Sequence, residues 1–312
     1  MTPFADFAAA SRAAVEQALD GYLPRPPACP AVVAEAMRYS VMAGGKRLRP
    51  ILVLAAADAV AHAQDSDRDA AARLALPAAC ALEFIHTYSL IHDDLPSMDD
   101  DALRRGRPTL HMVVGQGQAI LAGDGLQAEA FQLIAREPRS PDPAMMRRKL
   151  RVLDVVTRAA GAIGMVGGQA IDLEAAGKGA AAATALDGDA LSDMHARKTG
   201  ALIRASAAAG AILAGADDPC LAALDRWAAK VGLAFQIIDD ILDVEGASAD
   251  LGKTSGKDAA SGKPTYPALF GIDRSKALAA DATAHAAAAL ADAGLRPSHL
   301  DAIAEWIVGR RS

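Results

Sequence analysis

The chain has 312 residues and a formal net charge of −6 at pH 7, and apolar residues make up 52% of it while aromatic residues make up only 4%. This length corresponds to two average domains or one large one. A negative charge without Lys/Arg-rich runs leaves no electrostatic footprint for nucleic acid or for a membrane surface. We therefore expect no nucleic-acid partner.

The N-terminus lacks the basic region and apolar core of a signal peptide, and no uncharged apolar run reaches the ~18–20 residues that a membrane span requires. The three cysteines, Cys29, Cys80 and Cys220, are odd in number and match no zinc spacing and no disulfide framework. We therefore expect reduced thiols in a soluble, cytoplasmic protein with no membrane insertion.

Alanine dominates the sequence and is the best helix former, whereas strands favour β-branched and aromatic residues. The composition therefore predicts an all-α fold. Apolar spacing and the positions of Gly and Pro predict helices at about 4–20, 31–42, 51–61, 72–95, 111–136, 145–174, 189–214, 220–244, 275–293 and 298–309. The tract 177–188 and the Gly-, Ser- and Lys-rich stretch 245–263 are predicted loops, the second a flexible lid that closes over phosphate. Because no linker interrupts the chain, we expect a single domain, 1–312.

The segment AGGKRLRP at 43–50 lies between the second and third predicted helices. Gly44 and Gly45 break the helix, and Lys46, Arg47 and Arg49 follow them. Bare glycine backbone lets an anion approach while the cations neutralise it, so this segment is a candidate phosphate cradle. The alternative is a set of solvated basic residues at a helix start.

Five aspartates fall within nine residues of the stretch 82–109, namely Asp93, Asp94, Asp99, Asp100 and Asp101, and Arg104 and Arg105 follow. Carboxylates this close repel one another unless a positive charge lies among them. A divalent cation site, with arginines ready for the anion that the metal holds, explains the pattern. The alternative is a solvated acidic loop.

Helical geometry limits how these groups can meet. His86 and Asp93 are seven residues apart, so they face the same way on one helix, although a satisfied core histidine is the alternative. Asp93 and Asp99 are separated by a turn of ~240° on a regular helix, which points them apart. Because Pro96 lies between them, we predict that the helix ends or bulges here and brings Asp99 back beside Asp93.

A second acidic cluster ends the predicted helix 220–244. Asp239 and Asp243 share one face, Gln236 lies one turn earlier, and Asp240 lies to the side. Two acids on one stripe of an apolar helix, without a basic neighbour at that spacing, are hard to explain by packing. Other polar groups on predicted helices are Gln169 and Asp172 in GGQAIDLE and Lys198 and Thr199 in HARKTGAL.

Two acidic clusters and many cations together favour a diphosphate held through magnesium. Mg²⁺ typically binds one or two carboxylates plus substrate phosphate oxygens. An iron or manganese carboxylate bundle is the competing interpretation, but it requires Glu-x-x-His pairs, and Glu83 and His86 form one such pair without a matching second one. The surrounding lysines and arginines would also be unfavourable around a bare metal pair.

The motifs GGKRLRP, LEFIHTYSLIHDDLPSMDDDALRRGRPT, GGQAIDLE, HARKTGAL, FQIIDDILD, and LGKTSGKD with GKPTYPAL follow one another between residue 44 and about residue 269. In these motifs the chain resembles the polyprenyl (isoprenyl) diphosphate synthase family of trans-prenyltransferases, and most of all its bacterial farnesyl diphosphate synthases. Terpene cyclases also carry a DDxxD motif, but they replace the second acidic motif with an Asn/Ser/Glu pattern. The resemblance implies an isoprenoid synthase bundle of about ten or more helices around a central cavity, several Mg²⁺ ions with Mn²⁺ as a substitute, and a homodimer.

The resemblance also implies a role for each motif residue. The implied metal ligands are Asp93, Asp99 and Asp239, with Asp94 and Asp243 as ligands or outer partners. Arg104, Lys198 and Lys253 would hold the allylic diphosphate, and Lys46, Arg49, His86 and Arg105 would hold the diphosphate of isopentenyl diphosphate. Lys198, Thr199 and Gln236 are the implied catalytic group, the last two turning oxygen dipoles toward the developing carbocation. Gln169 and Asp172 are polar groups of the cavity.

The implied reaction is ionisation of the allylic diphosphate, attack by the double bond of isopentenyl diphosphate and loss of a proton to the departing diphosphate. Tyr88 lies five residues before Asp93, or ~7.5 Å along the helix. In the resemblance an aromatic residue there goes with a fifteen-carbon product, farnesyl diphosphate, whereas an ordinary core tyrosine is the alternative. The other interpretations are a geranyl or geranylgeranyl diphosphate synthase and a non-catalytic prenyltransferase partner subunit, which usually lacks one acidic motif or the basic residues.

Overall fold

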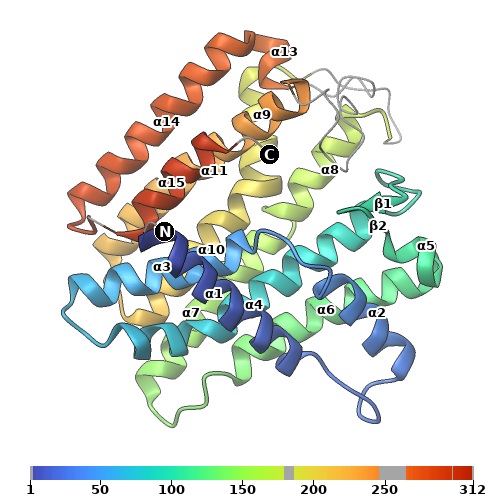
Figure 1. Ribbon diagram of the computed structural model, residues 1–312, viewed down its shortest axis with the longest axis horizontal. Coiled ribbons are helices and arrows are strands. Elements are labelled where there is room, and N and C mark those ends of the chain that lie inside the picture. The colour runs from blue at the N-terminus through green and yellow to red at the C-terminus, as the bar shows by residue number, and fades with distance from the viewer. Residues whose placement is uncertain (1–2, 179–185, 246–264, 297, 311–312) are drawn as a thin grey trace. The chain divides into compact units, whose positions relative to one another are not determined.

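Alanine-rich helices build almost all of the described protein (Figure 1). The computed structural model describes residues 3–178, 186–245, 265–296 and 298–310. Within these residues the only strands are the two-residue β1 (Leu103–Arg104) and β2 (Arg107–Pro108), so the predicted all-α class is confirmed. The chain forms two compact units, unit 1 with residues 1–154 and 209–215 and unit 2 with residues 155–208 and 216–312. The single domain expected from the sequence stays a prediction.

Unit 1 is built around one long helix. Its helices are α1 (Pro3–Tyr22), α2 (Ala31–Val41), α3 (Leu48–Ala63), α4 (Arg68–Asp93), α5 (Leu110–Val114), α6 (Gln116–Arg136) and most of α7 (Pro143–Ala160). Helix α4 packs against α3 and α6, and its buried alanines allow close approach of those helices. By length and composition α4 could cross a membrane, but 72% of its most apolar window is buried inside the protein. Its apolar side chains are therefore the core of unit 1.

Unit 2 is built around α11 (Asp218–Glu245), which packs along α14 (Ile272–Asp292) and also contacts α15 (His299–Gly309). The other elements are α8 (Met165–Ala175), α9 (Gly188–His195), the π-helical turn η1 (Ala196–Gly200), most of α10 (Ala201–Ala214) and α13 (Tyr266–Phe270). Turn η1 lies against both α8 and α11. The positions of α8, η1 and α11 therefore bring three of the sequence motifs together.

Three predicted helices are interrupted. Gly115, with φ of +83°, separates α5 from α6 within the predicted helix 111–136, because a left-handed residue ends a helix. Residues 161–164 separate α7 from α8, and η1 interrupts the predicted helix 189–214. Much of the predicted loops 177–188 and 245–263 lies outside the described residues. The three cysteines are free thiols, as predicted.

Candidate active site

The helix that carries the start of the first acidic motif ends within the motif, as the sequence predicts. Helix α4 ends at Asp93, and the backbone N–H of Asp99 donates to the carbonyl of Asp93 at 2.9 Å. The N–H of Asp101 likewise donates to the carbonyl of Asp94 at 3.2 Å, while Asp100 adopts a left-handed φ of +55°. The chain thus turns back on the end of α4, which confirms the predicted return of Asp99 to Asp93.

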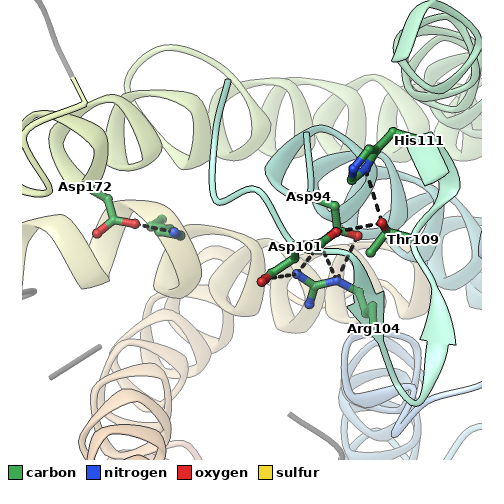
Figure 2. A network of polar contacts seen from close by, with 7 residues as sticks. Asp94, Asp101, Arg104, Thr109, His111 and Asp172 are labelled. Atoms are coloured by element: carbon green, nitrogen blue, oxygen red, sulfur yellow. Dashed lines mark hydrogen bonds and ion pairs between the residues drawn. The ribbon is translucent and has the colours of Figure 1, made fainter. Parts of the chain in front are cut away.

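Asp94 is buried beside Arg104 of the β1–β2 hairpin (Figure 2). Nε of Arg104 donates to the two carboxylate oxygens at 2.8 and 3.0 Å, and its Nη2 lies 2.6 Å from Oδ1. The side chain of Asp94 is only 5% exposed. Burial raises the pKa of Asp94, and the guanidinium of Arg104 opposes that rise. Both oxygens of Asp94 are therefore engaged by a cation.

The hairpin that carries Arg104 turns through Arg105 and Gly106, whose φ angles are +53° and +72°. Positive φ at both central residues is typical of a tight type I′ hairpin turn. After the hairpin, the hydroxyl of Thr109 donates to the carbonyl of Asp101 at 2.6 Å and lies 3.2 Å from Nδ1 of His111 (Figure 2). These contacts fasten the end of the acidic motif to the start of α5.

The basic segment before α3 approaches the same hairpin. Arg105 donates to the carbonyl of Gly44. At Gly45, whose φ is +133°, a Cβ atom would lie 2.6 Å from the guanidinium carbon of Arg105, so only glycine permits this contact. Lys46 is exposed on this segment.

His86 lies within this basic cluster. Burial lowers the pKa of His86 well below its usual value, and the charges of Arg49, Arg105 and two further arginines lower it more. The structure therefore brings together Arg49, His86 and Arg105, three of the four residues that the resemblance implies for isopentenyl diphosphate. The neutral imidazole offers an N–H donor rather than a charge.

Arg47, between Lys46 and Arg49 in the sequence, has a different position. Its side chain is 1% exposed, Nη1 lies 2.7 Å from Oε1 of Glu83, and Nη2 donates to the carbonyl of Val41 at 2.7 Å. Arg47 thus joins the start of α3 to α4. This pair also gives Glu83, which is 2% exposed on α4, the cationic partner that a buried carboxylate requires.

Tyr88, the expected determinant of chain length, is 6% exposed on α4. Its ring packs edge-on against His92 with 5.8 Å between the ring centroids. Burial raises the pKa of Tyr88, and the neighbouring Gln127 of α6 opposes the rise, although the Tyr88 hydroxyl is buried without a hydrogen-bond partner among the described residues. The tyrosine is a fixed, well-packed group in unit 1.

The second acidic motif lies on regular helix in unit 2, as predicted. Asp239 and Asp243 are partly buried, whereas Asp240 is 6% exposed, so the third acid does point away from the other two. Asp239 pairs with Arg310 at 2.7 Å, and the Arg310 side chain is 4% exposed over the ring of Phe235. The sequence analysis missed this basic partner, because it comes from the C-terminal end of the chain.

The implied catalytic lysine lies in the π-helical turn η1. Asp172, labelled in Figure 2, accepts a hydrogen bond from Nζ of Lys198 at 2.5 Å. A Cβ atom on Gly168 would lie 2.2 Å from the backbone nitrogen of Lys198, so the glycine of GGQAIDLE lets η1 pack directly on α8. Thr199 and Gln169 lie on the same two elements, and π turns occur frequently at functional sites.

Gln236 is the remaining predicted site residue that the structure describes. Its amide nitrogen lies 2.9 Å from Nδ1 of His195, a residue that the sequence analysis did not single out. Lys253 lies outside the described residues. The signal that could have found His195 is its place in HARKTGAL, directly before η1.

The carboxylates fit magnesium chemistry. Among the described residues, no group of three or more His, Cys, Asp or Glu side chains is close enough to form a preassembled metal site. Mg²⁺ does not require one, because it typically takes one or two carboxylates and completes its shell with water and phosphate oxygens. Asp93 with Asp99, and Asp239 with Asp243, each offer such a pair of oxygen donors.

Comparison with known proteins identifies the family. A family model described as polyprenyl synthetase matches residues 30–293. The farnesyl diphosphate synthase of Geobacillus stearothermophilus is 49% identical over 263 residues, which cover 84% of this chain and 83% of that protein. The geranylgeranyl diphosphate synthase of Cyanophora paradoxa is 44% identical over 261 residues, covering 84% of this chain and 81% of that one.

A solved structure of a prenyl diphosphate synthase has a fold similar to that of this chain. The apo crystal structure of an FPP/GFPP synthase from Zymomonas mobilis matches with a TM-score of 0.81 and 34% identity, covering 98% of this chain and 99% of that one. The family model covers most of the chain, and the two relatives are 49% and 44% identical to it over the aligned residues. The chain belongs to the polyprenyl synthetase family.

Proposed function

We propose that the chain is a trans-prenyltransferase that condenses isopentenyl diphosphate with dimethylallyl or geranyl diphosphate and releases mainly farnesyl diphosphate. The observation that supports this proposal is the presence of two kinds of side-chain cluster. The acidic motifs, together with the cations Arg104 and Lys198 that buried carboxylates hold, suit a diphosphate held through metal ions. The cluster of Arg49, His86 and Arg105 suits a second diphosphate that is held by cations and N–H donors alone.

The acidic motifs supply the metal ligands in this proposal. Asp93 and Asp99 in unit 1 and Asp239 in unit 2 would ligate Mg²⁺, with Asp243 as a ligand or an outer partner. When bound, Mg²⁺, or Mn²⁺ in its place, supplies positive charge to the leaving diphosphate. We assign Asp94 to positioning Arg104, because both of its oxygens accept from that guanidinium.

Two further groups of cations bind the substrates. Arg104 and Lys198, each held by a buried carboxylate, would contact the allylic diphosphate, together with Lys253. Lys46, Arg49, His86 and Arg105 would bind isopentenyl diphosphate. Binding an anion beside His86 favours its protonated form, so we expect proton uptake when isopentenyl diphosphate binds.

The proposed reaction has three steps. The allylic C–O bond breaks, and its electron pair leaves with the diphosphate that Arg104 and Lys198 hold. Thr199 and Gln236 would present oxygen dipoles to the carbocation, and the double bond of isopentenyl diphosphate supplies the electrons of the new C–C bond. The condensed cation loses a proton to the departed diphosphate, so the protein needs no nucleophile or general base of its own.

Tyr88 sets the product length in this proposal. A packed ring beneath the first acidic motif would stop the growing chain at fifteen carbons. Tyr88→Ala is therefore expected to yield products of twenty carbons or more, whereas Tyr88→Phe keeps the ring and the fifteen-carbon product. An unchanged product spectrum in Tyr88→Ala would remove Tyr88 from this role. A geranylgeranyl product from the wild-type chain is the alternative that the relative from Cyanophora paradoxa keeps open.

One incubation tests the proposed function. The purified chain receives Mg²⁺, labelled isopentenyl diphosphate and, in separate tubes, dimethylallyl, geranyl or farnesyl diphosphate, and the product lengths are measured. A fifteen-carbon product from the first two primers and none from the third supports farnesyl diphosphate synthesis. A twenty-carbon product keeps the reaction and changes the product. No product in any tube, with diphosphate still bound, favours a non-catalytic partner subunit.

The oligomeric state and the cellular location of the chain are also proposals. We propose a soluble, cytoplasmic homodimer, because the resemblance implies a homodimer and alanine-rich helices permit close interfaces. Sedimentation equilibrium of the purified chain measures its mass in solution, and a monomer at micromolar concentration would contradict the dimer.

A further inference from the structure

His195 is a buried histidine that the roles above leave unassigned. It is the last residue of α9, directly before η1, and it is 8% exposed. Its ring stacks on that of Tyr266 with 5.9 Å between centroids and 27° between planes. A polar ring at such a position requires partners, since a buried polar group without them is costly.

The two ring nitrogens of His195 face different groups on α11. Nδ1 lies 2.9 Å from the amide nitrogen of Gln236. Nε2 makes no hydrogen bond within the described part of the chain, and the nearest carboxylate oxygen to it there is Oδ2 of Asp240 at 3.9 Å, an oxygen that accepts from the backbone N–H of Tyr266 at 2.9 Å. Asp240 is itself 6% exposed. The imidazole therefore lies between a fixed carboxylate and the side chain of Gln236.

This arrangement selects one protonation state of the ring. Burial lowers the pKa of His195 to about 4, against the opposing charge of Asp172 and with the charge of Lys198. A neutral imidazole carries one N–H and one lone pair. The carboxylate of Asp240 favours the hydrogen on Nε2, which leaves the lone pair on Nδ1. That lone pair can accept only from the NH₂ group of the Gln236 amide.

We propose that His195 is a positioning residue that fixes the orientation of the Gln236 amide, so that its oxygen and not its NH₂ group is presented to the allylic carbocation. The inference rests on the proposed function. In an amide the nitrogen and oxygen lie on opposite sides of one carbon, so holding the nitrogen at the imidazole directs the oxygen away from it. The reversed amide would turn two N–H donors toward a positive charge and destabilise it.

A double-mutant cycle tests this coupling. His195→Phe keeps a ring for the Tyr266 stack but removes the lone pair, and we expect kcat to fall about 10²-fold with both KM values within about twofold, as for the loss of one preorganised dipole. His195→Asn restores an acceptor oxygen near the position of Nδ1, and we expect it to recover at least about tenfold of that loss. In a Gln236→Met background, His195→Phe is expected to have no further effect, because the group it positions is gone.

A spectroscopic measurement on the wild-type chain supports the cycle and serves if the Phe variant does not fold. Proton–nitrogen spectra of the ¹⁵N-labelled wild-type chain identify which ring nitrogen of His195 carries hydrogen, with His195→Asn used to assign the signal. Hydrogen on Nε2 is expected, and hydrogen on Nδ1 overturns the inference. Equal losses from His195→Phe in both Gln236 backgrounds also overturn it and leave the proposed function intact. A wild-type chain without condensation activity overturns both.

Discussion

The two acidic motifs hold their carboxylates in opposite ways. In unit 1 the chain leaves α4 at Asp93, and backbone hydrogen bonds fold the next eight residues back on the helix end. In unit 2, Asp239 and Asp243 lie on uninterrupted helix, and their spacing alone places them together. The first arrangement depends on local turns and the second on helical period, so the two pairs of aspartates are brought together by different routes.

The cations beside the motifs differ in the same way. Arg104 lies ten residues after Asp94 and meets it through a tight hairpin, so the first motif and its cation form one local segment. Lys198 reaches Asp172 from η1, and Arg310 reaches Asp239 from the end of the chain. The electrostatic surroundings of the second motif are therefore set by tertiary structure. Unit 2 should tolerate changes of local sequence near α11 better than unit 1 tolerates changes in its hairpin.

The sharpest test of equivalence between the motifs is to remove one proposed metal ligand from each. Asp99→Asn and Asp239→Asn keep the side-chain shape but remove the charge, and each is expected to lower kcat about 10³-fold, the scale of losing one preorganised source of charge stabilisation. Steady-state assays at saturating Mg²⁺ measure the loss.

Asp100→Asn is the matched control for that comparison. Asp100 belongs to the same motif but is exposed and left-handed at φ of +55°, a conformation that asparagine tolerates. Its activity should stay within about twofold of wild type. A near-normal Asp239→Asn beside an inactive Asp99→Asn would break the comparison and leave only the first motif as a metal site.

The next largest effect concerns the lysine of unit 2. Lys198→Met should lower kcat/KM for the allylic diphosphate about 10²-fold and also lower stability, because the buried Asp172 loses its ion pair. Adding Asp172→Asn should restore the stability but not the activity, which separates binding of the substrate from support of the fold. Urea denaturation and steady-state kinetics measure the two properties.

Arg197→Met provides the control for Lys198. Arg197 is the preceding residue of η1, but its side chain is 39% exposed and pairs with the exposed Asp193 at 2.7 Å. An exposed pair of this kind stabilises the fold little, so both properties should change little. Recovery of activity in the Lys198→Met/Asp172→Asn double variant would contradict a direct role for the lysine.

These tests also separate what the sequence could predict from what it could not. The break after Asp93 followed from Pro96 and from the failure of helical spacing, and the common face of Asp239 and Asp243 followed from a spacing of four. Both depend on neighbouring residues only, and the structure confirms both. The helix ends at Gly115 and in η1 were missed because apolar periodicity continues across them.

The side chains that contact Asp239 and Gln236 could not be predicted, because they come from distant parts of the sequence. Arg310 and His195 are distant from α11 in sequence, and neither forms a pattern with Asp239 or Gln236 that one chain alone could reveal. The hairpin arginines were easier, since Arg104 and Arg105 follow the acids directly. The sequence thus predicted local chemistry well and left the tertiary contacts of unit 2 to the structure.

Each unit also contains a buried neutral histidine, and acid should act on both. The pKa of His195 is about 4 in the folded chain and near 6.5 when unfolded, so between these values the unfolded chain binds more protons. Stability therefore rises with pH through this window and is complete above about pH 6.5. At pH 5 the wild-type chain should lose about 2 kcal/mol of unfolding free energy through this residue.

His195→Asn isolates that contribution, because asparagine does not titrate there. The variant should show a smaller loss between pH 7.5 and pH 5 in urea denaturation than the wild type does. His86→Asn should reduce the loss in the same direction, since burial and the surrounding arginines also lower the pKa of His86. An unchanged pH dependence in His195→Asn would mean that this ring is not held neutral in unit 2.

The smallest expected effect comes from a test of whether the guanidinium of Arg310 competes with a metal ion for Asp239. Its guanidinium neutralises Asp239 at 2.7 Å, whereas the carboxylate is 44% exposed, so a metal ion binding to Asp239 must replace or share this contact. Arg310→Met keeps the packing over Phe235 and should tighten Mn²⁺ binding roughly fivefold, the equivalent of about 1 kcal/mol for a partly exposed ion pair. Electron paramagnetic resonance of Mn²⁺ without substrate measures this affinity.

Arg204→Met is the control: it breaks the exposed Arg204–Asp225 pair elsewhere in unit 2 and should leave the Mn²⁺ affinity unchanged. Weaker Mn²⁺ binding in Arg310→Met would instead mean that the arginine orients Asp239 for the metal, so that Arg310 would support the second motif and not compete with the metal.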